Sequence, residues 1–311
     1  MINLQEPHHG KALTGGLRAQ GSKREKFANL PIVSIVTVVM NGIEHIEKTI
    51  LSVLNQGYAN IEYIIVDGGS TDGTLDVIRK YEEYLEYWIS ESDSGIYDAM
   101  NKGIALCSGE LVGLLNADDS YEPNAINAVV DSYKINGQNE CILYGNYKIY
   151  MNMLVNETVS ACSFKTKNFF NWFKLFKVEL LKYRTVDISP KLDLLKSVTL
   201  CHQALFVSRS VYQKSNYDLR FKLAADYHFM LNNYKFGIPY VKVNQTMVRY
   251  RGDGATFQRF WRSNFETLLA FHDVYKFNSL EFLRFFSLRS TGFVKLITKL
   301  VVLKTLKNFL K

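Results

Sequence analysis

"ELVGLLNADD" (residues 110–119) is a short apolar run that ends in two adjacent carboxylates. The apolar part predicts a buried strand. Two neighbouring like charges repel each other, so the acids need water, hydrogen-bond donors or a cation. Asp118 and Asp119 therefore have two interpretations: a solvated loop in which an acid caps the next helix, or a metal site that holds a phosphate. The surrounding sequence decides between them.

The segments before this run alternate between strands and helices. "PIVSIVTVVMN" (31–41) is rich in β-branched residues, as is typical of a strand buried on both faces. "IEYIIVDGGSTDGT" (61–74) predicts a second strand that ends in a glycine-rich turn, and "YWISES" (87–92) predicts a third. The segments between these strands have apolar residues at helical spacing and predict helices. Later in the chain, residues 238–256 predict an edge strand pair with a glycine-containing loop. The alternation predicts an α/β fold, a Rossmann-like open and mostly parallel sheet with helices on both faces.

Acids follow three of these strands. Asp67 ends the second strand, Asp93 follows the third, and Asp118 and Asp119 follow the fourth. Open α/β sheets bind ligands at the carboxyl ends of their strands, so we expect these acids to share one crevice. Each has a local alternative: Asp67 forms a turn before two glycines, and Asp93 caps the next helix.

The glycine pattern excludes two common ways of holding phosphate. The turn after the first strand, "VMNGIEH" (39–45), has one glycine instead of G-x-G-x-x-G, and no G-x-x-x-x-G-K-[ST] motif occurs. A divalent cation on carboxylates is the other common way to neutralise a diphosphate. The expected cofactor is therefore Mg²⁺ or Mn²⁺.

The charge is unevenly distributed along the 311 residues. The net charge is +7, but residues 1–30 carry +3 (five basic against two acidic) and residues 276–311 carry +7 (eight against one), which leaves −3 for the body. This argues against a nucleic-acid groove in the body. The basic tail, rich in Phe and Leu, favours an anionic membrane surface; a helix packed on the body is the alternative.

Cysteine spacing and hydropathy indicate the compartment. The four cysteines are widely spaced, with no zinc-type cluster, and predict reduced thiols. The first 30 residues lack an apolar signal core, and the longest apolar stretches fall short of the ~20 residues of a membrane span. We expect a cytoplasmic protein, peripheral at most on the inner face of the membrane.

Four motifs in this order resemble the family-2 glycosyltransferases of the GT-A fold: "SIVTVVMNG" (34–42), "IIVDGGSTDGT" (64–74), "SDSGIYDAMNKGIALCSGELVGLLNADD" (92–119) and "AADYHFML" (224–231). The resemblance runs from about residue 31 to 256. It implies an inverting transferase that moves a sugar from a nucleotide-diphosphate donor, such as a UDP- or GDP-sugar. "SGIYDAMNKGIALCSGE" is similar to bacterial members that build capsule, lipopolysaccharide or colanic-acid-type polymers, which implies a saccharide or lipid-linked saccharide acceptor.

The resemblance also implies roles for single residues. Asp67 would contact the donor base, and Asp118 would face the ribose or the metal while Asp119 holds the metal–diphosphate. The remaining expected donor contacts are Thr37, Val39, Asn41, Asp93 and Lys102. The alternative to a diphosphate contact for Lys102 is an ordinary solvent-exposed lysine.

Asp226 in "AADYHFM" (224–230) stands where the family places its catalytic base, the acid that accepts the acceptor's proton. Many members have Glu-Asp there, whereas this chain has Ala225-Asp226; an ordinary first-turn acid is the alternative. His202 in "CHQ" is either a hydrogen-bonded core histidine or a contact of the sugar or acceptor. "FQRFW" (257–261) misses the Q-x-x-R-W spacing of processive members, which implies a single-addition transferase.

Two other functions remain open. A sugar-phosphate nucleotidyltransferase would need a glycine-rich loop with Arg after the first strand, which is missing, and a non-catalytic nucleotide-sugar-binding protein would not need Asp226.

Residues 150–200 predict either a partly helical excursion on the acceptor side or a helix packed on the sheet. The expected organisation is a disordered basic leader (1–30), a GT-A domain (31–256) with a nucleotide-sugar half (31–150) and an acceptor half (151–256), and a basic helical tail (257–311).

Overall fold

The computed structural model describes residues 12–22, 27–150, 200–251 and 259–276. The expectations for residues 151–199, for the "FQRFW" motif's first residues and for the tail from residue 277 onward lie outside these described residues.

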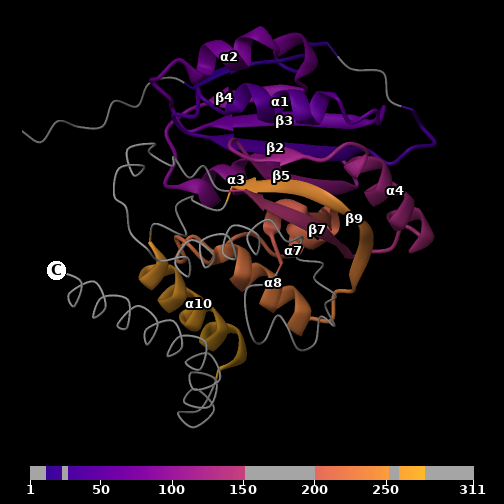
Figure 1. Cartoon of the computed structure of the whole chain (residues 1–311), viewed down its shortest axis with the longest axis vertical. Helices are drawn as coiled ribbons and strands as arrows, with labels where there is room; N and C mark the ends of the chain where they lie inside the picture. The colour runs from indigo at the N-terminus through magenta and orange to yellow at the C-terminus, as the bar shows by residue number, and fades with distance from the viewer. Residues whose placement is uncertain (1–11, 23–26, 151–199, 252–258, 277–311) are drawn as a thin grey trace, which may run out of the picture.

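The described residues form one nine-stranded mixed sheet in the order β1-β4-β3-β2-β5-β8-β7-β9-β6. Neighbours β4, β3, β2 and β5 are parallel, as are β7 and β9, and the other pairings are antiparallel. Figure 1 follows the sheet from β4 at the top to β7 and β9. The strands are β1 Leu13–Gly15, β2 Val33–Val39, β3 Ile61–Asp67, β4 Tyr87–Ser90, β5 Leu111–Asn116, β6 Ser120–Tyr121, β7 Ile142–Tyr150, β8 Leu205–Ser208 and β9 Tyr240–Arg251.

Helices cover both faces of this sheet, as the strand composition predicts. All seven residues of β2 are buried, because β-branched side chains on each face meet a helical layer. The α-helices are α1 Ile46–Leu54, α2 Thr74–Lys80, α3 Ile96–Leu106, α4 Ala125–Ile135, α7 Arg209–Lys214, α8 Ala225–Lys235 and α10 Phe260–Tyr275, with 3₁₀ turns η1 Glu82–Tyr84 and η3 His202–Ala204. The predicted α/β architecture is confirmed.

Two hydrophobic clusters divide the core between the faces. In one, α3, α7, α8 and α10 pack on the sheet face that carries Val36; in the other, α1, α2 and α4 pack on the face that carries Ile35. Gly103 allows α3 to cross β2 closely, since a Cβ there would lie 2.3 Å from Val36 Cγ1. This contact places the start of α3 next to the carboxyl end of the sheet.

The expectation of a disordered leader over residues 1–30 is wrong for the part that the structure describes. β1 pairs antiparallel with β4, and Arg18 reaches back to the body, where its guanidinium contacts Glu62 at 3.0 Å and donates to the Leu106 carbonyl at 2.9 Å. A buried carboxylate therefore holds residues 12–22 against the sheet.

Two boundaries near the end of the domain also need correction. Residues 240–251 form one long strand, with register irregularities near Asn146, instead of an edge strand pair; β9 lies between β7 and β6 inside the sheet. The predicted domain end at residue 256 precedes α10, which packs on α8 and buries Ala270 and Phe271 in the core. The body therefore extends at least through α10.

No described helix combines the length and the low polarity that crossing a lipid bilayer would require.

Candidate active site

The carboxyl ends of the four parallel strands lie level at one edge of the sheet. In register, Val39 of β2 stands beside Asp67 of β3, and Asp67 stands beside Ser90 of β4. On the other side of β2, Val38 pairs with Asn116, the last residue of β5. This register brings the strand ends that carry or precede the acids to one edge of the sheet, and a shared crevice for the acids stays a prediction.

Asp67 turns inward at this edge. It is fully buried, its Oδ2 accepts from the Ser70 N–H at 3.0 Å and from the Ser90 hydroxyl at 2.6 Å, and its Oδ1 accepts from the Ser70 hydroxyl. The carboxylate thus presents no surface to a donor base. The structure favours the alternative interpretation, an acid that shapes the glycine-rich turn.

The first-strand residues divide in the same way. Thr37 is fully buried, with its hydroxyl 3.0 Å from the Tyr63 hydroxyl, and Val39 is buried in the core. Both were expected to contact the donor, but neither lies at an open surface. Asn41 does lie on the surface, in the left-handed region at φ 50°. Its backbone N–H donates to the Ser70 hydroxyl and its side-chain oxygen accepts from the Thr71 N–H, which joins the β2 end to the turn after β3.

Asp93 and Lys102 also lie near this edge, with different surroundings. Asp93 is half-buried and accepts from the Gly95 N–H at 2.8 Å, and its Oδ2 lies 2.5 Å from where a Cβ on Gly68 would stand. Lys102 forms ion pairs with Glu91 at 2.9 Å and Asp98 at 3.6 Å. The ammonium is thus paired with protein acids, a further alternative to the predicted diphosphate contact.

The two carboxylates after β5 have different environments. Asp119 is 2% exposed; its Oδ1 accepts from the Arg251 N–H and its Oδ2 from the Gln203 amide, both at 2.8 Å. Burial, followed by the charge of Asp118, holds the pKa of Asp119 well above its usual range. Asp118 is half-buried. Asp118 is therefore the member of the pair with the larger surface toward a ligand.

The loop that carries the pair is fixed from α1. The Thr49 hydroxyl lies 2.6 Å from the Ala117 carbonyl and 2.7 Å from the Asp119 carbonyl, and both contacts are buried. The side-chain oxygen of Asn116 is buried without a hydrogen-bond partner among the described residues. Asn116 and Asp118 together bring oxygen ligands to the end of β5, the ligand type that Mg²⁺ and Mn²⁺ prefer.

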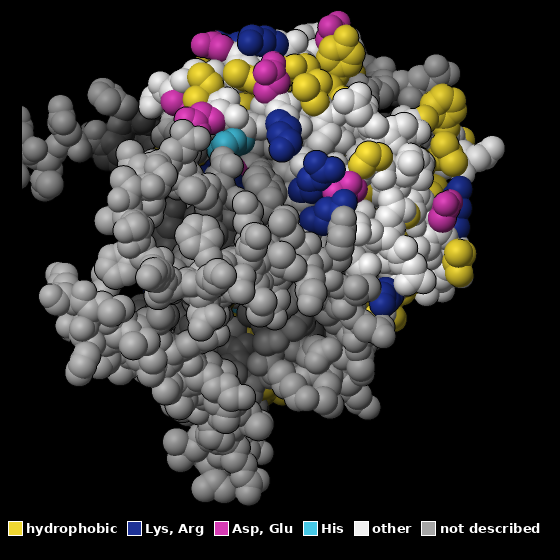
Figure 2. Space-filling view, viewed as in Figure 1, with side chains coloured by type: hydrophobic (Ala, Val, Ile, Leu, Met, Phe, Trp, Pro, Cys, Tyr) yellow, Lys and Arg dark blue, Asp and Glu magenta, His cyan; other side chains and the backbone are white. Residues whose placement is uncertain are grey.

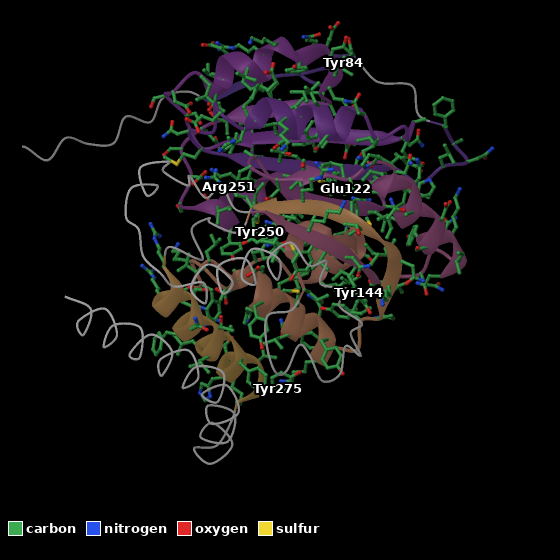
Figure 3. All side chains as sticks on the ribbon, viewed as in Figure 1. Tyr84, Glu122, Tyr144, Tyr250, Arg251 and Tyr275 are labelled. Atoms are coloured by element: carbon green, nitrogen blue, oxygen red, sulfur yellow. The ribbon has the colours of Figure 1, made fainter. Side chains whose placement is uncertain are left out.

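Sequence reasoning missed the contribution of β9. Tyr250 and Arg251 end this strand and are labelled close together in Figure 3. Arg251 Nη1 lies 2.6 Å from His45 Nε2, at the start of α1. Burial and then the charges of Cys201, Asp119, Asp226 and Asp118 raise the pKa of Tyr250. Only the "RYR" ending of a strand hints at these residues in the sequence.

Asp226, the first-turn acid of α8, lies in a polar cluster with two other side chains. Its Oδ1 accepts from the Tyr97 hydroxyl at 2.9 Å, and its Oδ2 lies 3.2 Å from His202 Nδ1. Burial raises the pKa of Asp226, but the hydrogen bond and charge of His202, with the Tyr97 hydrogen bond, outweigh it and leave this pKa below its ordinary value. Tyr97 was missed, although it sits inside the "GIYDAM" motif.

The segment Cys201–Gln203 connects the two groups of acids. His202 contacts Asp226, the Cys201 thiol donates to Gln203 Oε1 at 2.8 Å, and the Gln203 amide donates to Asp119. Adjacent residues of this segment therefore contact the end of β5, through Gln203, and the start of α8, through His202. The arrangement puts candidate metal ligands and a candidate base beside one segment.

A second group of acidic and histidine side chains lies elsewhere, among Asp218, His228 and Asp273, whose ligand atoms lie within 4.8 Å of one another. Arg220 forms ion pairs with both acids, at 2.5 Å to Asp218 and 3.1 Å to Asp273. Its guanidinium supplies the positive charge that a metal would bring, so this cluster is an ion-pair network that ties α8 to α10.

This chain is similar in sequence to known glycosyltransferases. Residues 34–185 match the model of glycosyl transferase family 2. An uncharacterised glycosyltransferase of Mycobacterium tuberculosis is 30% identical over 208 residues, which cover 66% of this chain and 70% of the relative. A PGL/p-HBAD biosynthesis glycosyltransferase of Mycobacterium bovis is 28% identical over 204 residues, with 64% and 68% covered.

Solved structures with little sequence identity share the fold. Residues 1–349 of TarS from Staphylococcus aureus, in complex with UDP-GlcNAc, superimpose with a TM-score of 0.56 at 13% identity, over 82% of this chain and 70% of that one. The mannosyltransferase PcManGT from Pyrobaculum calidifontis, in complex with GDP-Man and Mn²⁺, gives a TM-score of 0.55 at 14% identity, over 80% and 66%. The mixed sheet is thus GT-A-like, and with the family match and the mycobacterial relative it follows that this chain belongs to glycosyl transferase family 2 and is a glycosyltransferase.

Proposed function

We propose that the chain transfers a sugar, with inversion, from a nucleotide-diphosphate sugar to a hydroxyl of a saccharide or lipid-linked saccharide. The observation that carries this proposal is that consecutive residues contact both groups of acids: Gln203 contacts Asp119, the neighbour of Asp118, and His202 contacts Asp226. The first group has the chemistry to hold a diphosphate, and the second has the chemistry to take a proton from an attacking hydroxyl.

The donor nucleotide is proposed to lie along the ends of β2 and β4. Asn41 and Asp93 are the predicted donor residues that retain exposed surface there. Met40 and Ile43, 65% and 44% exposed, flank Asn41 with apolar surface suited to the face of a base. TarS and PcManGT have been captured with UDP-GlcNAc and with GDP-Man, which supports a UDP- or GDP-sugar as the donor.

Asp118 is proposed to hold the metal, with the Asn116 side-chain oxygen beside it, whereas Asp119 shapes the loop. The resemblance implies that Asp119 holds the metal–diphosphate. Asp118 takes this role in the proposal, because Asp119 is buried and already accepts two hydrogen bonds. A bound Mg²⁺ or Mn²⁺ would stabilise the charge that develops on the leaving diphosphate. Arg251, held by its contact with His45, is positioned to add positive charge at the same edge.

The acceptor side is proposed to be built around α8, with residues 31–150 forming the donor half and the later part of the chain the acceptor half. A lipid-linked saccharide of a surface polysaccharide or glycolipid agrees with a relative named for PGL/p-HBAD biosynthesis. The acid-poor basic tail is proposed to attach the enzyme to the anionic inner face of the membrane.

A donor screen tests this function. UDP-, GDP- and dTDP-sugars are added to the full chain with and without Mn²⁺, and both the melting temperature and the release of nucleoside diphosphate are followed. We expect one donor family to stabilise the chain in a metal-dependent manner and to be turned over. Stabilisation without any turnover would favour a non-catalytic nucleotide-sugar-binding protein, and pyrophosphate release from a nucleoside triphosphate and a sugar phosphate would favour a nucleotidyltransferase.

A further inference from the structure

We infer that His202 Nε2 is the atom that takes the proton from the attacking hydroxyl, and that Asp226 holds the imidazole in place for this step. The inference rests on the proposed function and assigns the base of that site to a pair of residues instead of to Asp226 alone. It follows from which carboxylate oxygens of Asp226 and ring nitrogens of His202 already have hydrogen-bond partners in the protein.

Both oxygens of Asp226 have partners within the protein. Oδ1 accepts from the Tyr97 hydroxyl at 2.9 Å and from the Tyr227 N–H at 2.8 Å, and Oδ2 faces His202 Nδ1 at 3.2 Å. A carboxylate held this way stays ionised and orients its donors. The hydrogen bonds from Tyr97 and Tyr227 favour the ionised form and so act to lower the pKa of Asp226, which makes this carboxylate a weaker base.

The contact with Asp226 determines which nitrogen of His202 is basic. A carboxylate accepts hydrogen bonds, so Nδ1 must carry the hydrogen that points to Oδ2, and the neutral ring then has its lone pair on Nε2. Nε2 is shielded from solvent and has no hydrogen-bond partner among the described residues. A buried polar atom without a partner carries an uncompensated desolvation cost, which argues for a partner supplied by the substrate.

The surrounding titratable groups do not compete for this role. Tyr97 from α3, Tyr217 before α8 and Tyr250 from β9 each have a raised pKa, mainly because they are buried, so they stay neutral and act as donors. The Cys201 thiol has a raised pKa for the same reason. The Glu266 carboxylate on α10 accepts from two backbone N–H groups and pairs with Arg262.

The step balances without any further reactant. As the acceptor oxygen forms its bond to the anomeric carbon, its proton passes to His202 Nε2, and the bond from that carbon to the diphosphate oxygen breaks with its electron pair. The imidazolium that results lies against the ionised Asp226, which stabilises the new charge. The proton returns to solvent after the products leave.

The test compares His202→Gln with His272→Gln, a substitution at an exposed histidine on α10. Donor binding is measured by calorimetry, and turnover by nucleoside diphosphate release with water as the acceptor. We expect His202→Gln to bind donor within about twofold of the parent and to lose about 100-fold in turnover, as is typical of a lost general base. His272→Gln should keep both.

Chemical rescue separates this inference from its alternative. Added imidazole should restore part of the turnover of His202→Ala, whereas a purely structural role of His202 would not respond to it. Retention of turnover within about threefold in His202→Gln, or no rescue of His202→Ala by imidazole, would overturn the inference and return the base to Asp226. A parent that binds or turns over no sugar nucleotide would instead overturn the proposed function. If His202→Gln fails to fold, the rescue of His202→Ala still decides.

Discussion

Two buried carboxylates at opposite ends of the parallel strands, Glu62 in β3 and Asp119 after β5, have opposite electrostatic surroundings. Glu62, 1% exposed near the amino ends, accepts from the hydroxyls of Ser34 and Ser108, the Ser108 N–H and Arg18, and its pKa is lowered although burial alone would raise it. Asp119, 2% exposed at the carboxyl ends, has two neutral donors and Asp118 as its neighbour, and its pKa is raised.

The difference separates an acid that stabilises the fold from an acid that belongs to a site. At the amino ends, a full set of donors and a guanidinium satisfies the charge of Glu62, so it contributes to stability. At the carboxyl ends, burial and the charge of Asp118 raise the pKa of Asp119 well above its usual range, and a strongly shifted pKa of this kind is typical of functional sites. The following substitutions test this distinction.

Asp118→Asn should have the largest effect. If Asp118 holds the metal, removing its charge should lower turnover at least about 100-fold, because metal charge stabilisation supplies several kcal/mol. Metal-dependent affinity for the nucleoside diphosphate should fall as well, while the melting temperature stays near the parental value. Calorimetry with and without Mn²⁺ measures this, with Asp76→Asn on the exposed face of α2 as control. Equal Mn²⁺-dependent binding by variant and parent would remove Asp118 from the metal site.

Glu62→Gln should lower the free energy of unfolding by about 2–4 kcal/mol, because it leaves buried donors and Arg18 without their shared acceptor. Turnover of the folded variant should be unchanged, since Glu62 lies at the end of the strands away from the site. Urea unfolding measures the loss. A variant as stable as the parent would show that the donors find other partners.

The same carboxylate makes stability depend on pH. The pKa of Glu62 in the folded protein lies below its ordinary value of 4.5, so its contribution is present above that value and is lost as the pH falls through the folded-state pKa. Parental stability should therefore decline below about pH 4.5, and Glu62→Gln should show a shallower decline. Parallel curves for the two proteins would contradict this assignment.

These contrasts mark what could be predicted from the sequence. The acid-bearing strand ends were predictable because β-branched runs and intervening helices determine a parallel register, and register brings Val39, Asp67 and Asn116 to one edge. The orientation of each acid was not predictable, because it depends on short turns: Asp67 turns inward onto Ser70 and Ser90.

Contacts between residues far apart in the sequence could not be predicted either. Glu62 reads as a polar position in a strand, and its partner Arg18 lies 44 residues earlier, in a leader expected to be disordered. Asp226 was predicted from its motif, but its contact with Tyr97 spans 129 residues and depends on how α3 and α8 pack together. No local pattern carries such pairings, since packing of distant elements creates them.

Asp119→Asn should have a smaller effect than either substitution above. The amide keeps one acceptor for the Arg251 N–H but offers a donor toward the Gln203 amide, so the loop should shift slightly. We expect about a tenfold loss of turnover and less than about 1 kcal/mol of change in unfolding free energy. A loss of metal-dependent binding as large as that of Asp118→Asn would instead make Asp119 a metal ligand, as the sequence first suggested.

Arg18→Met should have the smallest effect. The side chain is 35% exposed, so solvent screens its 3.0 Å contact with Glu62. Its Nη1 hydrogen bond to the Leu106 carbonyl and its position 5.7 Å from the centre of the Tyr87 ring add local contacts. We expect a loss of about 1 kcal/mol in the free energy of unfolding, clearly below that of Glu62→Gln.

The matched control for this arginine is Arg79→Met, because Arg79 on α2 also pairs with an acid, Asp76 at 3.4 Å, and lies 5.9 Å from the centre of the Trp88 ring. Asp76 is exposed whereas Glu62 is buried, so Arg79→Met should change stability by less than about 0.5 kcal/mol. Urea unfolding at low and high salt compares the two variants, and added salt should reduce the loss from Arg18→Met by a smaller fraction than the loss from Arg79→Met, because Glu62 is buried whereas Asp76 is exposed. A loss from Arg18→Met equal to that from Glu62→Gln would mean that the guanidinium alone satisfies the buried acid, and the serine donors would then contribute little to the contrast with Asp119.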